Sequence, residues 1–576
     1  LELQGKGIEV DWLWLSGQGE GKVPAALQRT GPLKLDGRIR RAYQSSQAQS
    51  YSFYLHPPKG ATLIADIGSE GNTEFVVRAQ TVDGETKEVF RQAATKSWQT
   101  AIVDLSAFAG KAIRLELATE GEETAAGWGE PGIYVEGSES PEGDRGTPAK
   151  NLVLVVMDTT RADQFELFDK DNEIHTPVLD AWSKRATTFV RAYNNSNWTK
   201  PSMASMFSGL YAITHTATKP ASILPEGIEL ISEHLQKQGL KTHGLTANPV
   251  VSEKFGFERG WDGFEVTYKA DAGSKAMYTK AAKWVEDNGD KPFFLYVQTI
   301  EPHTTYSVPK EYWSRYYSKP GYSGPFGQEF TRDDQKKVND RVQKPNSNDV
   351  EWIQSLYHGE VTYQDEMIGI LLDKLEALGR LDDTIVVITN DHGEEIYDHG
   401  SFGHGWQLDD FMIQAPLVIH YPPVFPKETV VDAVVEHVDL APTLLEAMGL
   451  PPMKATEGRS FLPTLKGQHE QLPRYALSTS DNGKRTIIIG NWKLIVSKSK
   501  GWKHLYDMRE AELKKNDKRK QAELAGRLCE IYMGESMATP NKLQRLEGGG
   551  MGQQFKAVEA ELDEETRKEL EALGYL

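Results

Sequence analysis

Four uninterrupted apolar runs constrain the fold of this chain more than any other feature. They read NLVLVVM from residue 151, PFFLYVQT from 292, TIVVITN from 384 and APLVIHY from 415. Such runs are typical of strands buried on both faces of a parallel sheet, because helices cover both sides of it. Helical patterns such as QDEMIGILLDKLEALG separate them. We therefore predict an α/β domain whose mostly parallel sheet is sandwiched by helices.

The chain changes character along its 576 residues, a length that suits roughly two to four domains. Before the first apolar run, short segments rich in β-branched and aromatic residues alternate with turns such as GSEGN and DGET. After the last run, KRTIIIGNWKLIVSK and KHLYDM predict a small antiparallel sheet. We expect an N-terminal β-sandwich over 1–148, an α/β domain over 149–473, a small C-terminal α+β subdomain over 474–535 and a helical tail over 536–576.

The charge balance and the cysteine count exclude several classes of protein. The chain has 83 acidic against 65 basic residues and a net charge of −18, which argues against nucleic-acid binding. Cys529 is the single cysteine, so no intrachain disulfide forms. No apolar run approaches the roughly 18 residues of a membrane span. Because the chain starts at Leu1 without a methionine, we interpret a signal or anchor as removed and expect a periplasmic or extracellular location.

The stretch SNWTKPSMASMFSGL, from residue 196, predicts a helix that begins near Thr199 and ends at Gly209. Proline suits the first helical turn, and glycine suits the position just past a helix end. Free N–H groups and the helix dipole favour an anion at such a start. A threonine there is ordinarily only a cap, so the rest of the chain decides whether Thr199 is reactive.

Acidic residues and histidines follow the apolar runs. In open α/β sheets, ligands bind beyond the carboxyl ends of the strands. The first run is followed by Asp158, the second by His303 and the third by Asp391 and His392, with His404 in the Gly-rich loop beyond. Two carboxylates and an imidazole suit a divalent metal ion, and the histidine shifts the preference from Ca²⁺ or Mg²⁺ toward Zn²⁺ or Mn²⁺.

A threonine oxygen in the same metal shell becomes an effective nucleophile, because the ion lowers its pKa. We expect Thr199 in this role. His303 and His404 would then contact the substrate anion or protonate the leaving oxygen.

These motifs resemble the alkaline phosphatase/sulfatase superfamily, specifically its sulfatase-like branch. The resemblance covers about 150–510 and is carried by DTTRAD, TKPSMASMFSGLY, EPHTTY, NDHGEE with GSFGHG, and EGRSFLP. It implies the following roles: metal ligands Asp158, Thr199, Asp391 and His392, with Thr199 also the nucleophile; His303 on the substrate anion; His404 where sulfatases place a lysine; and Asn248 facing the pocket. The expected N-terminal sandwich lies outside the resemblance.

The nucleophile motif departs from that of sulfatases, which is C/S-x-P-x-R. Here it reads Thr199, Lys200, Pro201, Ser202, Met203. Threonine cannot be oxidised to formylglycine, and Met203 replaces the arginine, so we expect no formylglycine and no sulfatase cycle. A threonine nucleophile resembles the phosphodiesterases, phosphonate hydrolases and phosphoethanolamine or glycerophosphate transferases of the superfamily. Lys200 either binds the substrate or points to solvent.

We therefore predict a metal-dependent hydrolase of phosphate esters, preferably diesters, or of phosphonate esters. Its substrate is a small anionic ester or a glycan-linked or lipid-linked phosphate ester. Three alternatives stay open: a sulfatase with an unmodified threonine, a phosphoethanolamine-type transferase, and a catalytically degenerate protein whose sandwich binds glycans through Trp98, Trp128 or Tyr134.

Overall fold

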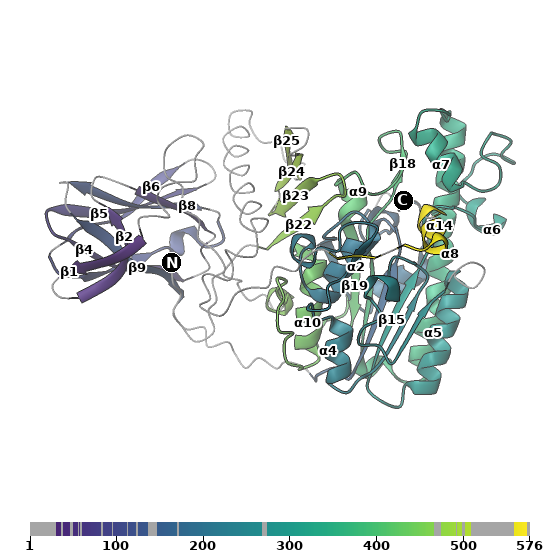
Figure 1. Cartoon of the computed structure of the whole chain (residues 1–576), viewed down its shortest axis with the longest axis horizontal. Coiled ribbons are helices and arrows are strands. Elements are labelled where there is room, and N and C mark those ends of the chain that lie inside the picture. The colour runs from purple at the N-terminus through teal and green to yellow at the C-terminus, as the bar shows by residue number, and fades with distance from the viewer. Residues whose placement is uncertain are drawn as a thin grey trace.

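The computed structural model shows an N-terminal sandwich, a large α/β domain and a small C-terminal sheet (Figure 1). The structure describes residues 30–35, 38–45, 50–55, 57, 60–81, 85–94, 96–111, 113–121, 125–135, 147–169, 172–267, 273–465, 474–490, 492–497, 502–508, 558–560 and 562–572. Most of the segment 137–150, whose glycines and prolines are typical of a linker, therefore lies outside the described residues.

Two antiparallel sheets form the N-terminal sandwich, as predicted. Their strand orders are β1-β2-β9-β4-β7 and β3-β8-β5-β6. The strands are β1 Thr30–Leu35, β2 Arg38–Ser45, β3 Ser50–Leu55, β4 Ala61–Ser69, β5 Thr73–Thr81, β6 Thr86–Ala94, β7 Gln99–Asp104, β8 Ile113–Gly121 and β9 Ala126–Val135, and the 3-10 turn η2 Ser106–Phe108 follows β7. Trp128 is fully buried between the sheets, edge-on to Phe75, so it belongs to the core and not to a glycan-binding face. Trp98 packs on Leu35, and the side chain of Tyr134 lies outside the described residues.

The large domain is built on one mixed sheet with the order β14-β13-β15-β10-β16-β19-β11-β20, and β21 also pairs with β11. The five strands from β14 to β16 are parallel, whereas β19 is antiparallel to both neighbours. The bounds are β10 Asn151–Met157, β11 Thr187–Tyr193, β13 Lys241–Thr246, β14 Gly263–Val266, β15 Phe293–Thr299, β16 Thr384–Asn390, β19 Gln414–His420, β20 Thr429–Val431 and β21 Val435–Glu436. Three of the four apolar runs are the adjacent strands β15, β10 and β16, which places their carboxyl ends together.

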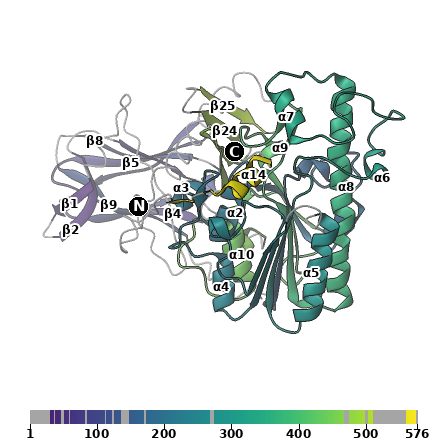
Figure 2. The same ribbon diagram turned by 45° about the vertical axis from the view of Figure 1, so that its right-hand side comes forward.

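Side chains of β10 alternate between two separate cores, which explains why the run is apolar throughout. Leu152, Leu154 and Val156 pack with α2, α4 and α10, and the residues between them pack with α1, α5 and α8. These helices cover opposite faces of the sheet (Figure 2). Their bounds are α1 Pro177–Ser183, α2 Thr199–Ser208, α4 Ile231–Lys237, α5 Ser274–Asn288, α8 Ser347–Ala377 and α10 Leu440–Ala447.

Short elements connect these layers. They are η3 Ala162–Gln164, α3 Ala212–His215, β12 Ser222–Ile223, η4 Glu253–Phe255, α6 Lys310–Trp313, α7 Arg332–Asn339, η6 Leu381–Asp383, β17 Glu395–Ile396, β18 Phe402–Gly403, α9 Asp410–Ile413, η7 His437–Asp439 and α11 Leu462–Leu465.

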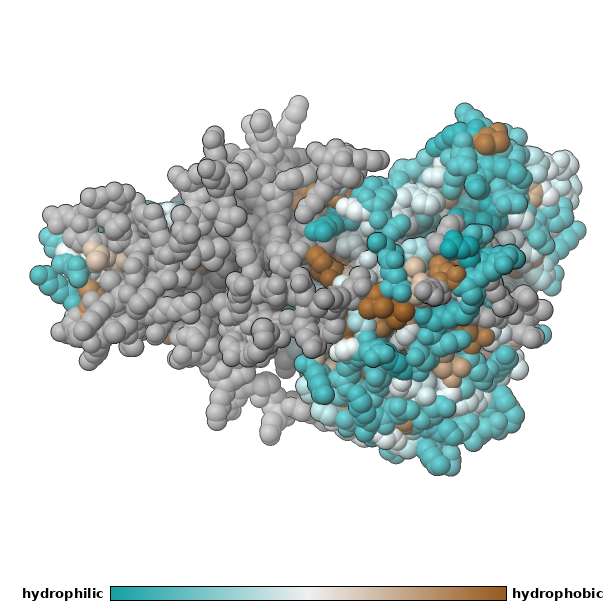
Figure 3. Space-filling view, viewed as in Figure 1, coloured by the Kyte–Doolittle hydropathy of each residue, from teal (hydrophilic) through white to brown (hydrophobic). Residues whose placement is uncertain are grey.

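Figure 3 shows one face of the molecule, on which hydrophobic residues are scattered among hydrophilic ones over the coloured part of the surface. Within the described ranges, no helix combines the length and the apolar character that crossing a membrane requires.

The predicted C-terminal sheet is present as four consecutive antiparallel strands. They are β22 Tyr475–Thr479, β23 Lys484–Ile489, β24 Trp492–Ser497 and β25 Trp502–Asp507. The sheet contacts the segment before α2, because Ser196 bridges Thr479 and donates from Oγ to its carbonyl at 3.0 Å. The rest of the expected subdomain, from 509 to 535, falls outside the described residues.

The end of the chain returns to the α/β domain. Besides the predicted helix, α14 Glu564–Ala572, it contains the short strand β26 Val558–Glu559, which pairs with β12. Ala560 N donates to Ala221 O at 2.7 Å, and Lys254 contacts Thr566. Leu570 is fully buried in the same core as α2. The described part of the tail is thus integrated into the domain that carries Thr199.

Replacement of Leu570 by alanine tests this packing. Loss of a fully buried leucine side chain is expected to lower the free energy of unfolding by about 2–5 kcal/mol. Urea denaturation followed by circular dichroism measures the change. Glu571→Ala, at the exposed neighbouring position, is the control and should stay within about 0.5 kcal/mol of the parent. Equal stability of the two variants would show that the tail does not pack as described.

The α/β domain is expected to fold without the sandwich. The sandwich has its own core, and residues 147–150 are already tied to the larger domain. Thr147 O accepts from Tyr421 Oη at 2.7 Å, and Ala149 N donates to Ala447 O at 3.3 Å. A chain that starts at Thr147 should therefore keep a cooperative thermal transition that is also seen in the full chain. A truncated protein that aggregates or melts without cooperativity would contradict this prediction.

Candidate active site

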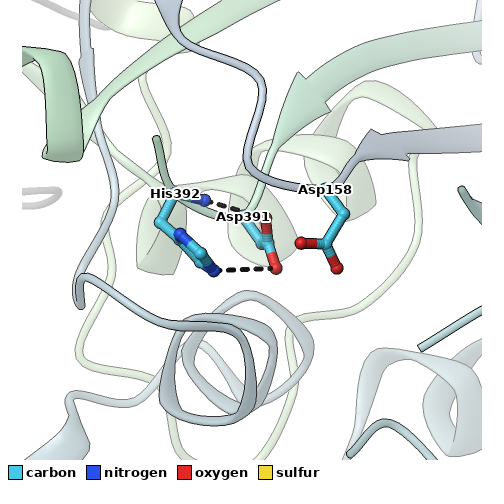
Figure 4. A group of neighbouring side chains, drawn as sticks. All are labelled: Asp158, Asp391 and His392. Carbon is cyan, nitrogen blue, oxygen red and sulfur yellow. Dashed lines mark hydrogen bonds and ion pairs between the residues drawn. The ribbon is translucent and has the colours of Figure 1, made fainter. Parts of the chain in front are cut away.

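Two carboxylates meet where neighbouring parallel strands end. Asp158 follows β10, Asp391 follows β16, and Met157 and Asn390, the residues before them, are register partners. One ligand atom from each of Asp158, Asp391 and His392 lies within 4.8 Å of the others, and all three residues are fully buried. Figure 4 shows the three side chains pointing toward one another. The strand register alone brings these groups together, as expected from the sequence.

Two side-chain amides hold the Asp158 carboxylate on one side. Its Oδ2 accepts from Asn248 Nδ2 at 2.6 Å and from Gln298 Nε2 at 3.0 Å. The orientation of the Gln298 amide is fixed because its oxygen accepts from Tyr296 Oη at 2.5 Å and from Thr246 Oγ1 at 3.2 Å. Asp158 Oδ1 is buried and has no hydrogen-bond partner among the described residues. This oxygen is therefore available to a ligand.

Backbone groups hold the other two members of the cluster. Asp391 Oδ1 accepts from the N–H groups of Thr159, at 3.2 Å, and His392, at 2.9 Å. His392 Nδ1 lies 2.8 Å from Gly393 O, and a carbonyl only accepts, so Nδ1 carries the proton. The lone pair of His392 Nε2 then faces Asp391 Oδ2 at 3.6 Å. A backbone carbonyl that fixes the tautomer in this way is the usual support of a metal-binding histidine.

These residues fit a divalent cation. Burial raises the pKa of Asp158 well above its usual value, and the nearby charge of Asp391 raises it further. Two buried carboxylates at this separation are stable as anions only with a compensating positive charge. The donors are two carboxylates, one imidazole nitrogen and a neighbouring hydroxyl. That set suits Zn²⁺ or Mn²⁺, and the preference for these ions over Ca²⁺ or Mg²⁺ stays a prediction.

Thr199 supplies that hydroxyl. It is the first residue of α2, after Trp198, and the helix ends at Gly209 with a left-handed φ of 67°. Thr199 Oγ1 lies 3.2 Å from His392 Nε2 and 3.3 Å from Asn248 Nδ2. The structure therefore brings together all four expected metal ligands, and Asn248 with them; their roles remain predictions.

The rings of the two candidate substrate histidines, His303 and His404, lie beside this cluster in an edge-on arrangement. The His404 ring centroid lies 4.4 Å from that of His392 and 5.0 Å from that of His303. His303 Nδ1 lies 2.8 Å from Thr304 O, and His404 Nδ1 lies 3.3 Å from Glu394 Oε2. Burial lowers the pKa of His303 to about 3 and lowers that of His404 well below its usual value, so both rings are neutral near pH 7.

The structure does not bring Lys200 into this cluster. Its ammonium donates to the carbonyls of Pro220 and, at 3.2 Å, Ser222, and lies 3.2 Å from the centroid of the Phe255 ring. Of the two alternatives for Lys200, the one in which it points to solvent is wrong, because the side chain is fully buried. This burial lowers the pKa of Lys200 well below its usual value. Met203, at the position of the sulfatase arginine, is also fully buried, in the apolar core.

Three residues beside the site were not anticipated from the sequence. Gln298 gave a signal, since it is a polar residue inside an otherwise apolar run. Glu394 lies in the NDHGEE motif but was not singled out; it is fully buried, its Oε1 has no partner among the described residues, and burial raises its pKa well above the usual value. Arg332 begins α7 and acts electrostatically on Glu394, and no sequence motif marks it.

Comparison with known families agrees with this geometry. The Sulfatase family model matches residues 150–450, just over half of the chain. A second model, described as N-sulphoglucosamine sulphohydrolase, C-terminal, matches residues 397–523. The fold and site thus define an ester hydrolase of the alkaline phosphatase/sulfatase superfamily. Within it, the chain belongs to the sulfatase family.

Individual relatives are named for different kinds of ester. A sulfatase from Formosa agariphila is 25% identical over 391 residues, which cover 58% of this chain and 76% of that protein. A phosphonate monoester hydrolase from Agrobacterium radiobacter aligns with a TM-score of 0.55 and 18% identity over 72% of this chain and 100% of that one. BT4656, in complex with D-glucosamine-2-N,6-O-disulfate, aligns with a TM-score of 0.55 and 18% identity over 70% of this chain and 99% of that one. At such identities, the structural likeness shows the fold.

The ligand assignment predicts the metal content of variants. Asp391→Asn and His392→Ala each remove one donor and should weaken metal binding by at least about tenfold. Elemental analysis after dialysis against a dilute chelator measures the retained metal. Asp365→Asn is the control, because Asp365 is also a buried carboxylate. Among the described contacts, its carboxylate accepts hydrogen bonds only from two backbone N–H groups of α1, at 2.8 and 2.9 Å. Unchanged metal content in both ligand variants would refute the assignment.

Proposed function

We propose that this protein hydrolyses phosphate esters, preferably diesters, or phosphonate esters through a covalent intermediate on Thr199. One observation carries the proposal: an unmodifiable threonine hydroxyl lies at a helix start, beside three buried metal-ligating groups. A serine or cysteine that becomes formylglycine is absent from this position. The alcohol itself is therefore the group that attacks.

The first step replaces the leaving group by the threonine. The Oγ1–P bond forms, the bond from phosphorus to the leaving oxygen breaks, the hydroxyl proton passes to solvent and the leaving oxygen takes up a proton. The neutral rings of His303 and His404 lie beside this oxygen and contact the substrate anion, and the proton comes from solvent. A divalent ion held by Asp158, Asp391 and His392 would supply positive charge that opposes the build-up of negative charge in this step. Asn248 Nδ2 orients Oγ1 through the contact at 3.3 Å.

The second step regenerates the enzyme. Water attacks the same phosphorus, the Oγ1–P bond breaks and Thr199 regains its proton. From a diester, the products are one alcohol and one phosphate monoester. Both steps attack phosphorus, and no bond to the β-carbon of Thr199 breaks. The threonine is therefore unchanged after each cycle.

Charge favours a diester over a monoester. A phosphate monoester carries nearly two negative charges at neutral pH, whereas a diester carries one. The site already holds two buried carboxylates, from the expected metal ligands Asp158 and Asp391. Lys200 is turned toward backbone carbonyls, and Met203 has no charge, so neither adds a cation. A singly charged ester therefore meets less repulsion here.

Sulfate esters are the second candidate. They also carry one charge, and the relative from Formosa agariphila is named a sulfatase. Charge alone therefore does not separate them from diesters. The nucleophile argues for phosphorus, since the sulfatase cycle needs a geminal diol that Thr199 cannot provide.

Variants at Thr199 test the proposal. Thr199→Ala should lower kcat by about three orders of magnitude or more, because only the attacking oxygen is lost, and Thr199→Ser should keep appreciable activity. Turnover is measured with an aryl phosphate diester, an aryl phosphate monoester, an aryl phosphonate and an aryl sulfate. Ser208→Ala, which removes a buried hydroxyl from the other end of α2, is the control and should leave kcat nearly unchanged.

Two outcomes would overturn the proposal. Full activity of Thr199→Ala, at unchanged metal content, would remove the threonine from the mechanism. Faster turnover of the aryl sulfate than of every phosphorus ester would make the protein a sulfatase with an unmodified threonine.

A further inference from the structure

Two basic side chains near the site, those of Arg161 and Lys200, are engaged in other contacts. Arg161 is buried between Asp163 and Asp398, with an Nη1–Oδ2 distance of 2.8 Å to Asp398. The Lys200 ammonium faces the carbonyls of Pro220 and Ser222. The charge of a bound divalent ion is offset by the carboxylates of Asp158 and Asp391. A further positive charge at the pocket would therefore favour binding of an anionic ester.

Helix α7 is fixed against the loop that carries His404. Asn339 pairs with the backbone of Phe402 twice, donating from Nδ2 at 2.8 Å and accepting at Oδ1 at 3.0 Å. Gln335, one turn earlier, packs on Gly403 so closely that a β-carbon there would lie 2.2 Å from Gln335 Nε2. The helix thus runs along β18 (Figure 1). Its first turn lies toward His404, the residue after β18.

The start of α7 is equally well defined. Thr331 caps the helix, accepting from Asp334 N at 3.3 Å, while the Asp334 carboxylate accepts from Thr331 N at 3.3 Å. Arg332 is the first helical residue, and its guanidinium donates to Gln335, the residue that packs on Gly403. The guanidinium is therefore held on the side of α7 that contacts the His404 loop.

Electrostatics agree with this placement. Burial is the main cause that lowers the pKa of His303 and of His404, and the Arg332 guanidinium lowers both further. It also opposes the effect of burial on Glu394. Arg332 is partly exposed, which leaves it accessible to a substrate.

We propose that the Arg332 guanidinium contacts the anionic group of the substrate and supplies the positive charge that Met203 cannot. The proposal rests on the proposed function, because it assumes an anionic ester in this pocket. A guanidinium presents paired N–H donors that match two oxygens of a phosphoryl or sulfuryl group. The substrate anion is then held between the metal ligands on the sheet and a cation on α7, a segment outside the nucleophile motif.

Anion binding tests this role separately from catalysis. Isothermal titration of the full-length, metal-loaded protein with inorganic phosphate, and then with sulfate, gives the affinity. Arg332→Met should weaken phosphate binding by about tenfold or more, since hydrogen bonds to charged groups are lost. Arg332→Lys should lose less phosphate affinity, because lysine keeps the positive charge but not the paired N–H donors of the guanidinium. Lys337→Met, a cation-to-methionine change on the exposed side of α7, should bind like the parent.

The measurements distinguish failure of this proposal from failure of the proposed function. Weaker phosphate binding in Arg332→Met, at unchanged metal content and melting temperature, supports the contact even if the parent hydrolyses none of the four aryl esters. Phosphate affinity equal to that of the parent overturns it, even if the parent is an active diesterase. If Arg332→Met is unstable, Arg332→Gln replaces it, and parental affinity in that variant overturns the proposal equally.

Discussion

The burial of two carboxylates at adjacent strand ends is the constraint on which the site depends. Asp158 and Asp391 are fully buried, and separating such groups from water costs several kcal/mol each unless they are paired. The chain compensates with the amides of Asn248 and Gln298 and with two backbone N–H groups. One oxygen of Asp158 still lacks a partner among the described residues. A divalent cation would complete the balance, and in the proposed function the same cation serves the neighbouring Thr199.

Much of this could be predicted from the sequence, because parallel strands buried on both faces have continuous apolar runs and end at one edge of the sheet. Asp158 and Asp391 were found for that reason. Lys200 could not be placed, since consecutive helical side chains point about 100° apart and its partners at Pro220 and Ser222 come from tertiary packing. Arg332 was missed because no motif connects α7 with the loop that it contacts 70 residues later in the chain, around Gly403.

The candidate nucleophile Thr199 and the loop that carries His404 are positioned by the same backbone segment. Asn197 O accepts from Gly405 N at 3.1 Å, and Asn197 Nδ2 donates to Gln407 O at 2.7 Å. Asn195 and Ser196 bind the first strand of the C-terminal sheet, through Leu477 O at 3.0 Å and Thr479 O at 3.0 Å. Thr199 and His404 are therefore fixed relative to each other before substrate arrives, which lowers the entropic part of the barrier.

The two departures from the sulfatase motif are physically linked. Positions 199 and 203 are one helical turn apart, so their side chains lie on the same face of α2. In sulfatases an arginine at the second position supports the hydrate of formylglycine at the first. Here no hydrate forms, and the second position holds Met203, fully buried in the apolar core. An arginine there would bury a charge among apolar side chains at a cost of several kcal/mol. Once the threonine replaces the aldehyde, the motif no longer requires its own cation, and charge for the substrate has to come from outside α2.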